Sequence, residues 1–270
     1  MIELSLIGIG TGNPDQVTLA AVRALNEADL ILLPRKGEAK ADLVDLRRML
    51  CQSLLEPEAP VNVVEFDLPV RDRRDDYLAT VDDWHDAISA VWGELIDRHL
   101  SGSGRVALMI WGDPSLYDSS LRIAGRLQSS GRSINLTVVP GITSLQVLTA
   151  EHRIPLNSLA EPVQITTGRR LREDGWPGGV NAVAVMLDGG GAFTVISSED
   201  VYIWWGAYLG MDKQCLIEGR LADVADRILE RRAELRRQHG WIMDIYLLKR
   251  DNALVSVQSV RSGDVPDKGE

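Results

Sequence analysis

The sequence predicts an α/β protein with two domains, and three observations support this prediction. Apolar runs rich in β-branched residues, beginning with residues 2–9, alternate in the first half with segments whose apolar residues recur at helical spacing. This alternation favours a mostly parallel sheet with helices on both faces. It ends in "HRIPLNSLAEP", residues 152–162, where two prolines and no periodicity indicate a linker. The 270 residues are enough for two domains of ordinary size.

The elements of the first domain, residues 1–153, follow from this pattern. Thr18 is a suitable N-cap for a helix over 18–28, in which Leu19, Val22 and Leu25 are expected to share the buried face. Further strands are predicted at 2–9, in "DLILLP" ending at Pro34, in "VNVVEFDLPV", at 104–114 and in "INLTVVPGITS". Further helices are predicted over 40–55, within the charged stretch 71–99, and after the strand at 104–114 as far as residue 130.

The second domain, residues 162–250, is expected to be smaller and to contain a mixed sheet. Its strand-like runs are "VQITT", "NAVAVMLD", "VYIWWGAYL" and "WIMDIYLL", and a long helix is predicted over 221–238. The tail, residues 251–270, is polar, and we expect it to be partly disordered over its last ten residues.

Composition excludes several classes of function. The formal charge of −10 argues against nucleic acid as the main partner. Cys51 and Cys215 form no metal or redox spacing, and the four histidines show no ligand spacing, so we expect no metal site and a reduced cytoplasmic setting. Glu3 stands where a secretory segment would be positively charged, and no apolar run is long enough to span a bilayer.

Three predicted strands of the first domain end in glycine-containing turns. These turns are "GIGTGNP", "WGDPSLY" and "VPGITS". In parallel sheets, ligands bind outside the carboxyl ends of the strands, and small residues there leave backbone groups open to a ligand. The sequence therefore predicts one ligand site to which all three turns contribute.

A dinucleotide site is the competing interpretation of the first turn. Its fingerprint needs a third small residue where Asn13 stands, and Pro14 follows where the helix should already run. The acid expected after the second strand is absent, because that position holds Pro34 and Arg35. Arg35 could face a 2′-phosphate, so an enzyme that uses NADP stays open as an alternative.

The ordered blocks of the chain resemble the tetrapyrrole (corrin/porphyrin) methylases. They are "GIGTGNPDQVT", "GDPSLY" at 112–117, "VVPGITSLQ" at 138–146 and "IPL" at 154–156, and the similarity spans residues 2–249. Thr11 stands where the family usually has proline, which leaves the shape of that loop open. The resemblance implies that family's two-domain fold, a methyl transfer from S-adenosylmethionine, and a tetrapyrrole substrate.

Four motifs of the second half resemble one branch of that family. They are "QITTGRRL", "VMLDG", "WWGAYLG" and "HGWIMDIYLL". The branch acts in aerobic cobalamin biosynthesis, where it methylates ring carbon 1 of precorrin-5 and releases acetate. Two alternatives stay open, a methylase of the same fold that acts at another carbon or on a non-tetrapyrrole substrate, and a non-catalytic tetrapyrrole carrier.

The resemblance also implies which residues bind each ligand. It places S-adenosylmethionine between the domains, against Gly112, Asp113, Leu116, Thr143, Ser144, Met186, Ala207 and Ile242. The first loop would face the macrocycle through Gly10, Thr11 and Gly12, with Asp15 and Tyr117 also on the substrate side. Because the substrate is a polycarboxylate, nearby arginines should bind it, and the candidates are Arg35, Arg169 and Arg170, with Lys36 and Arg172 beside them.

Two further expectations concern catalysis and assembly. Methyl transfer needs mainly positioning, so no triad or metal cluster is expected. Acetate release also needs a proton-transferring group, for which Asp15, Asp113, Tyr117 and Glu151 are equal candidates. The resemblance implies a homodimer, for which the tryptophan-rich segments at 84–92 and 204–205 could offer apolar surface.

Overall fold

The computed structural model describes residues 1–35, 41–70 and 77–250. It divides into a first unit, residues 1–143, and a second unit, which begins at Ser144. The division therefore falls ten residues before the predicted end of the first domain at 153. The reason is that helix α5 (Ser144–His152) packs on strands of the second sheet, whereas the sequence placed these residues in the first domain. The prediction for the tail at 251–270 lies outside the described residues, as does Lys36.

The first unit contains the predicted parallel sheet. Its strands are β1 (Ile2–Gly8), β2 (Leu30–Arg35), β3 (Asn62–Asp67), β4 (Gly104–Ile110) and β5 (Ile134–Val139), in the order β3-β2-β4-β1-β5. Every recorded pairing in this sheet is parallel. The connection from β1 passes β4 to reach β2, and the connection from β4 passes β1 to reach β5. These neighbouring strands are therefore followed by connections that run in opposite directions, with their helices on opposite faces of the sheet. In open α/β sheets, such a switch point is where ligands bind.

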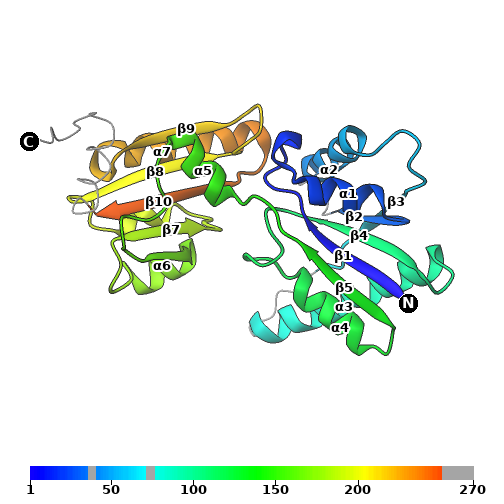
Figure 1. Ribbon diagram of the computed structural model, residues 1–270. Coiled ribbons are helices and arrows are strands. Elements are labelled where there is room, and N and C mark those ends of the chain that lie inside the picture. The colour runs from blue at the N-terminus through cyan, green and yellow to red at the C-terminus, as the bar shows by residue number, and fades with distance from the viewer. Residues whose placement is uncertain (36–40, 71–76, 251–270) are drawn as a thin grey trace, which may run out of the picture. The chain divides into compact units, whose positions relative to one another are not determined.

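Helices cover both faces of this sheet. Helices α1 (Leu19–Asn26) and α2 (Ala41–Leu54) lie on one face, and α3 (Tyr77–His99) and α4 (Ser120–Ser129) lie on the other (Figure 1). Each face has its own apolar core, because alternate residues of the strands point to opposite sides. Leu4, Leu6 and Leu108 pack with α3 and α4, whereas Ile7 and Ile31 pack with α1 and α2.

The start of α1 confirms one prediction and corrects another. The hydroxyl oxygen of Thr18 accepts a hydrogen bond from the amide of Ala21 at 3.1 Å, as an N-cap should. The predicted buried face is only partly correct, because Leu25 is buried and Val22 is partly buried, whereas Leu19 is 76% exposed. Ala21, which was not predicted to be buried, is. Ala21 packs in the same apolar core as Ile7 and Ile31 of the sheet.

The second unit contains the predicted mixed sheet. Its strands are β6 (Val163–Thr167), β7 (Ala182–Met186), β8 (Val201–Ala207), β9 (Cys215–Arg220) and β10 (Asp244–Arg250), in the order β6-β7-β10-β8-β9. Only β6 and β7 pair in parallel. Its other elements are α6 (Gly168–Asp174), the 3-10 turn η3 (Ala192–Val195) and the long helix α7 (Leu221–His239). Neither β9 nor α6 was predicted.

The tryptophans that were expected to offer apolar surface to a partner are mostly buried. Trp92 packs in the core of the first unit, and Trp204 and Trp205 are buried in the second. Trp84 is partly buried, so most of the apolar area of these four tryptophans is already covered within each unit.

No helix within the described ranges combines the length and the apolar composition that a membrane crossing would need.

Candidate functional site

The three glycine loops of the first unit meet at the carboxyl edge of the sheet. Gly10 and Gly112 form an isolated antiparallel bridge, in which the Gly112 amide donates to the Gly10 carbonyl at 2.8 Å and the Gly10 amide to the Gly112 carbonyl at 3.3 Å. This bridge joins the loops after β1 and β4. The predicted convergence of these loops is therefore present within the first unit.

Glycine is required where the three loops touch. A Cβ atom on Gly8 would lie 2.6 Å from the amide nitrogen of Gly141 and 2.8 Å from the carbonyl oxygen of Gly112. A Cβ atom on Gly141 would lie 2.7 Å from the carbonyl carbon of Gly8 and closer still to the Gly112 carbonyl oxygen. Backbone thus packs on backbone, with no room for a side chain. Gly8 and Gly141 were not among the predicted site residues, although both stand in the motifs that predicted the site.

Asp113 ties two of these loops together. One carboxylate oxygen accepts a hydrogen bond from the Gly141 amide at 2.9 Å, and the other accepts from the Ser115 amide at 2.8 Å and from its hydroxyl. Burial raises the pKa of Asp113, but the hydrogen bonds from Ser115 and Gly141 outweigh it and hold the pKa below its usual value. An ionised carboxylate that is already bonded to three donors suits a structural role better than proton transfer.

The first loop presents its backbone rather than a side chain. Gly10 (φ +68°) and Gly12 (φ +104°) adopt conformations that favour glycine. Between them, the buried Thr11 donates its hydroxyl proton to the side-chain oxygen of Gln16 at 2.8 Å, so its hydroxyl is used inside the loop. Asp15 is exposed in the 3-10 turn η1 (Pro14–Gln16).

The space beside Gly112 has room for a methyl group. A Cβ atom on Gly112 would meet only Thr143, at 3.9 Å. The neighbouring backbone therefore leaves open a volume of at least a methyl group where Gly112 and Thr143 face each other. Thr143 is itself buried and ends the first unit, and Ser144 begins α5.

Three strained residues directly follow predicted cofactor contacts. They are Tyr117 (φ +50°) after Leu116, Leu187 (φ +53°) after Met186, and Tyr208 (φ +50°) after Ala207. Within the described ranges five non-glycine residues have a positive φ, so most of them lie at these positions. A left-handed conformation costs an L-residue about 1–2 kcal/mol. Such strain collects at ligand sites, where surrounding contacts hold it in place.

The predicted cofactor residues of the second unit lie at the same end of three neighbouring strands, β7, β10 and β8. Ala207 pairs with Asp244 at the beginning of β10, and Val185 pairs with Tyr246, which puts Met186 level with Ile245. Ile242 lies two residues before β10 and therefore at the same end of these strands. The register of the strands, which the sequence alone did not define, brings Met186, Ala207 and Ile242 together.

The candidate arginines differ in their surroundings. Arg35, at the carboxyl end of β2, pairs with Asp67 at 2.8 Å while remaining about half exposed. Arg170 forms an exposed ion pair with Asp174 at 3.3 Å, which should contribute little to stability and leave the guanidinium available. Arg169 is exposed on the same helix, α6. Arg172, in contrast, already binds a buried carboxylate.

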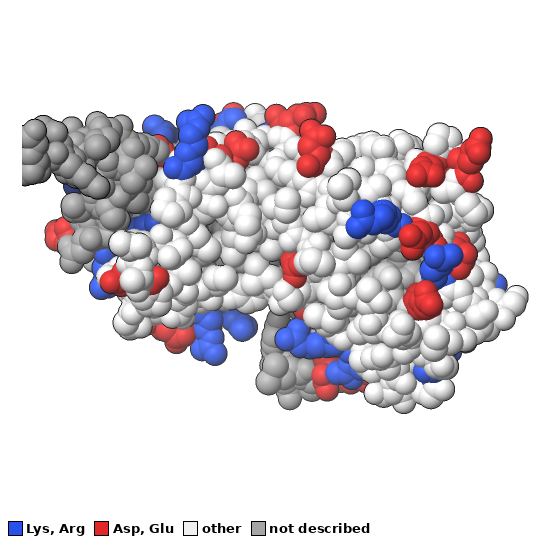
Figure 2. Space-filling view, viewed as in Figure 1, with Lys and Arg blue, Asp and Glu red and all other residues white. Residues whose placement is uncertain are grey.

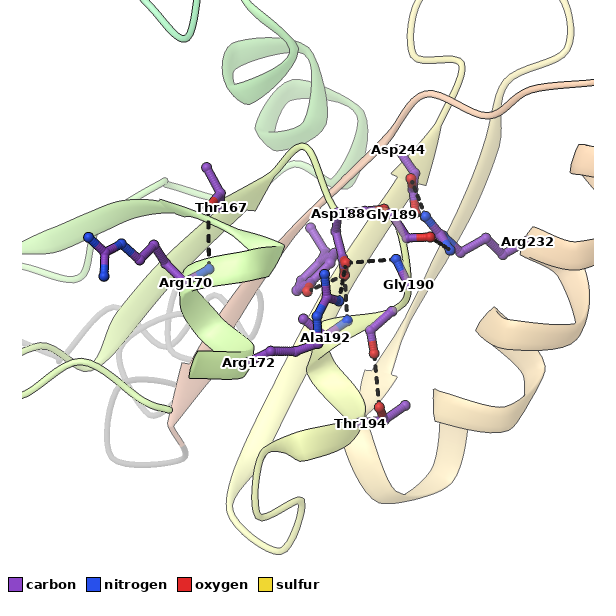
Figure 3. Close-up of polar contacts among 12 residues, drawn as sticks. Thr167, Arg170, Arg172, Asp188, Gly189, Gly190, Ala192, Thr194, Arg232 and Asp244 are labelled. Atoms are coloured by element: carbon purple, nitrogen blue, oxygen red, sulfur yellow. Dashed lines mark hydrogen bonds and ion pairs between the residues drawn. The ribbon is translucent and has the colours of Figure 1, made fainter. Parts of the chain in front are cut away.

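That carboxylate is Asp188, which the sequence analysis missed as a functional candidate. Its side chain is 1% exposed and lies among donors from α6, η3 and β10 (Figure 3). Arg172 donates to it at 2.9 Å, the Gly190 amide at 3.0 Å and the Tyr246 hydroxyl at 2.8 Å, and the Ala192 amide donates as well. The available signal was an acid two residues after a buried strand and directly before three glycines.

Charge on the visible surface is mixed. Lys and Arg side chains lie in small groups among Asp and Glu side chains, without a wide region of one sign (Figure 2). On this face, a polycarboxylate ligand would meet individual arginines rather than an extended basic field.

Comparison with known proteins gives one match to a family and several to individual proteins. The profile of the Tetrapyrrole (Corrin/Porphyrin) Methylases matches residues 3–225. Precorrin-6A synthase (deacetylating) from a Sinorhizobium species is 46% identical over 252 residues, which cover 93% of this chain and 96% of that protein.

Solved structures agree in fold. The crystal structure of a cobalamin synthesis related protein (CobF) from Corynebacterium diphtheriae has a TM-score of 0.80 and 36% identity, over 93% of this chain and 99% of that one. Uroporphyrin-III C-methyl transferase from Thermus thermophilus, solved with S-adenyl homocysteine, has a TM-score of 0.55 and 18% identity, over 92% of each chain. The second likeness concerns the fold alone.

Proposed function

Because this chain belongs to the tetrapyrrole (corrin/porphyrin) methylases, we propose that it converts precorrin-5 to precorrin-6A in cobalamin biosynthesis. The reaction transfers a methyl group from S-adenosylmethionine to ring carbon 1 and releases acetate. The observation that carries the proposal is the 46% identity to a precorrin-6A synthase over 93% of this chain and 96% of that protein. A match over nearly the full length of both proteins supports the whole activity rather than one shared domain.

The chemistry suits a site made of backbone and small residues. The sulfonium of S-adenosylmethionine supplies an activated methyl group and its own leaving group. The protein then has to align the attacking carbon with that methyl group and exclude water, which is a task of positioning. The bridged, glycine-packed loops of the first unit are rigid enough for this, since their backbones contact one another directly.

For the cofactor, we propose contacts on each unit. On the first unit they are Gly112, Asp113, Leu116 and Thr143, and on the second they are Ser144, Met186, Ala207 and Ile242. The open space beside Gly112 and the left-handed residues after Leu116, Met186 and Ala207 support this assignment. Asp113 would act by holding its loop, because its carboxylate is already bonded to Gly141 and Ser115.

For the substrate, we propose the backbone of Gly10, Thr11 and Gly12, with Asp15 and Tyr117 close by. Arg35, Arg169 and Arg170 are the proposed partners of its carboxylates, since a guanidinium binds a carboxylate through two parallel hydrogen bonds. The Tyr117 phenol is protonated at neutral pH, as an ordinary tyrosine is, and can donate a hydrogen bond. Partial burial raises its pKa further.

The test is to incubate the purified protein with precorrin-5 and S-adenosylmethionine labelled in the methyl group. We expect the label in the tetrapyrrole and one acetate released for each methyl group transferred. Methylation without acetate would favour a methylase that acts at another carbon. Tight tetrapyrrole binding without transfer would favour a carrier.

We also propose that the protein acts in the cytoplasm as a homodimer. The family resemblance supports the dimer, and the two isolated cysteines suit a reducing compartment. Light scattering at micromolar concentration should give about twice the mass of the 29.7 kDa chain. A monomeric mass would contradict the dimer.

A further inference from the structure

We propose that Asp188 is a positioning residue that holds the turn at Met186 and Leu187 in its cofactor-binding conformation. The inference rests on the proposed function, because it takes Met186 to be a cofactor contact. It goes further by assigning the geometry of that contact to a buried carboxylate two residues away, which does not itself need to touch the ligand.

The turn after β7 does not adopt its shape by default. Leu187 has a left-handed backbone (φ +53°), which is unfavourable for a residue with a Cβ atom. Its side chain is also 66% exposed, so burial of the leucine does not compensate for the strain. Contacts outside Leu187 must therefore keep the backbone in this conformation.

Asp188 supplies those contacts on the carboxylate side. One oxygen accepts from Arg172 of α6 and from the Gly190 amide (Figure 3). The other accepts from the Ala192 amide and from the Tyr246 hydroxyl. The Gly190 and Ala192 amides belong to the segment that follows Asp188, so their hydrogen bonds fold this segment around the Asp188 carboxylate. The Arg172 and Tyr246 donors fasten this loop to α6 and to β10.

The fold makes room for this carboxylate. A Cβ atom on Gly168, at the start of α6, would lie 2.6 Å from the Cβ atom of Asp188 and closer still to its carboxyl group. Glycine at position 168 therefore lets the carboxylate approach the first turn of α6. Burial alone would raise the pKa of Asp188, but the four hydrogen bonds outweigh it, so the group stays ionised.

A second arginine fixes the same loop from the backbone side. Arg232 of α7 donates to the carbonyl oxygens of Asp188 and, at 3.4 Å, of Gly189. It also pairs with the buried Asp244 at 2.7 Å, which accepts a further hydrogen bond from the Trp205 ring nitrogen at 2.9 Å. The carbonyl groups of Asp188 and Gly189 and the carboxylate of Asp188 are thus all hydrogen-bonded. Because these residues directly follow Leu187, they leave its strained backbone little freedom to relax.

The test compares Asp188→Asn with the unaltered protein by calorimetry with S-adenosylhomocysteine. The substitution replaces one accepting oxygen by an NH2 group, which would face hydrogen-bond donors and release the turn. We expect D188N to bind about tenfold more weakly, equivalent to about 1.4 kcal/mol. The KM for S-adenosylmethionine should rise in parallel, while kcat at saturating cofactor and the KM for the tetrapyrrole change little. A purely structural role would lower the melting temperature without this split.

Asp97→Asn is the matched control, because Asp97 is an exposed carboxylate that pairs with Arg132 at 2.6 Å in the first unit. It should bind S-adenosylhomocysteine like the unaltered protein. A folded D188N protein with unchanged affinity would overturn the inference. If the unaltered protein does not bind S-adenosylhomocysteine at all, the proposed function fails instead, so the two failures are distinguishable.

Two further variants keep the inference falsifiable if D188N does not fold. Arg172→Gln removes only one of the four donors, from a side chain that is 39% exposed, and should weaken binding about threefold. Unchanged affinity in that variant would count against the inference. Leu187→Gly should couple with either change, because glycine adopts a positive φ freely. Arg172→Gln should therefore weaken S-adenosylhomocysteine binding less in a protein that already carries Leu187→Gly than in the protein with Leu187.

Discussion

Replacing Gly141 by alanine should disrupt the contact among the three loops of the first unit. The new Cβ atom would lie 2.7 Å from the carbonyl carbon of Gly8 and closer still to the carbonyl oxygen of Gly112. Gly141 does not have a positive φ, so the penalty comes from overlap rather than from its own backbone conformation. Both neighbours are backbone atoms of bridged loops and cannot turn aside as a side chain would.

The magnitude follows from this rigidity. Overpacking typically costs 1–3 kcal/mol, and backbone against backbone should reach the upper end, about 3 kcal/mol. For a protein of this size, such a loss lowers the melting temperature by roughly 6–12 °C. Gly125→Ala is the control, because a Cβ atom there meets nothing within 4 Å and the residue lies inside α4. Alanine should stabilise that helix by about 0.5–1 kcal/mol.

Thermal and urea unfolding, followed by circular dichroism, would measure both changes. Binding of S-adenosylhomocysteine to Gly141→Ala should weaken as well, because the loop carrying Gly112 must shift to admit the methyl group. The reasoning would be refuted if Gly141→Ala melted at the temperature of the unaltered protein, or if Gly125→Ala proved the more damaging of the two.

The remaining predictions concern the first loop, a buried histidine and a buried arginine. Gly12→Leu, at φ +104°, should reduce tetrapyrrole turnover while sparing S-adenosylhomocysteine affinity in calorimetry; the opposite pattern would move the cofactor to this loop. Burial holds the pKa of His85 below its usual 6.5. As pH falls, the unfolded chain therefore takes up a proton at this histidine before the folded protein does. The free energy of unfolding should then decrease as the pH is lowered from about 6.5. His85→Gln should reduce that drop in urea titrations, and an unchanged slope would contradict this. Arg47→Met removes the donor to the Met109 carbonyl and should cost about 1–3 kcal/mol in urea unfolding, whereas a neutral result would show that carbonyl to be satisfied otherwise.

Local sequence signals predicted the elements and the loops well. Strand β6 (Val163–Thr167) coincides with the predicted run, and α7 (Leu221–His239) extends one residue beyond its predicted end. Thr18 caps its helix as expected. These features depend on apolar periodicity, capping and turn residues, which act between neighbours in the chain and can be read from it.

Side-chain environments were predicted less well. The exposed face of α1 at Leu19 and the burial of Trp92, Trp204 and Trp205 both differ from expectation. Apolar periodicity indicates that a helix has an apolar face. Which residues of that face contact the sheet depends on how closely the helix packs against it. The burial of a tryptophan likewise depends on the strands that lie beside it.

From the sequence alone came the α/β class, the family, the methyl donor and the three loops, because each is written in local motifs. Only the tertiary structure revealed that Gly8, Gly112 and Gly141 are backbone contacts of one another. It alone also joined Asp188 to Arg172, 16 residues away, and to Tyr246, 58 residues away. The physical reason is that hydrogen bonding and steric overlap act over a few ångströms in space, and folding, not chain order, decides which atoms come that close.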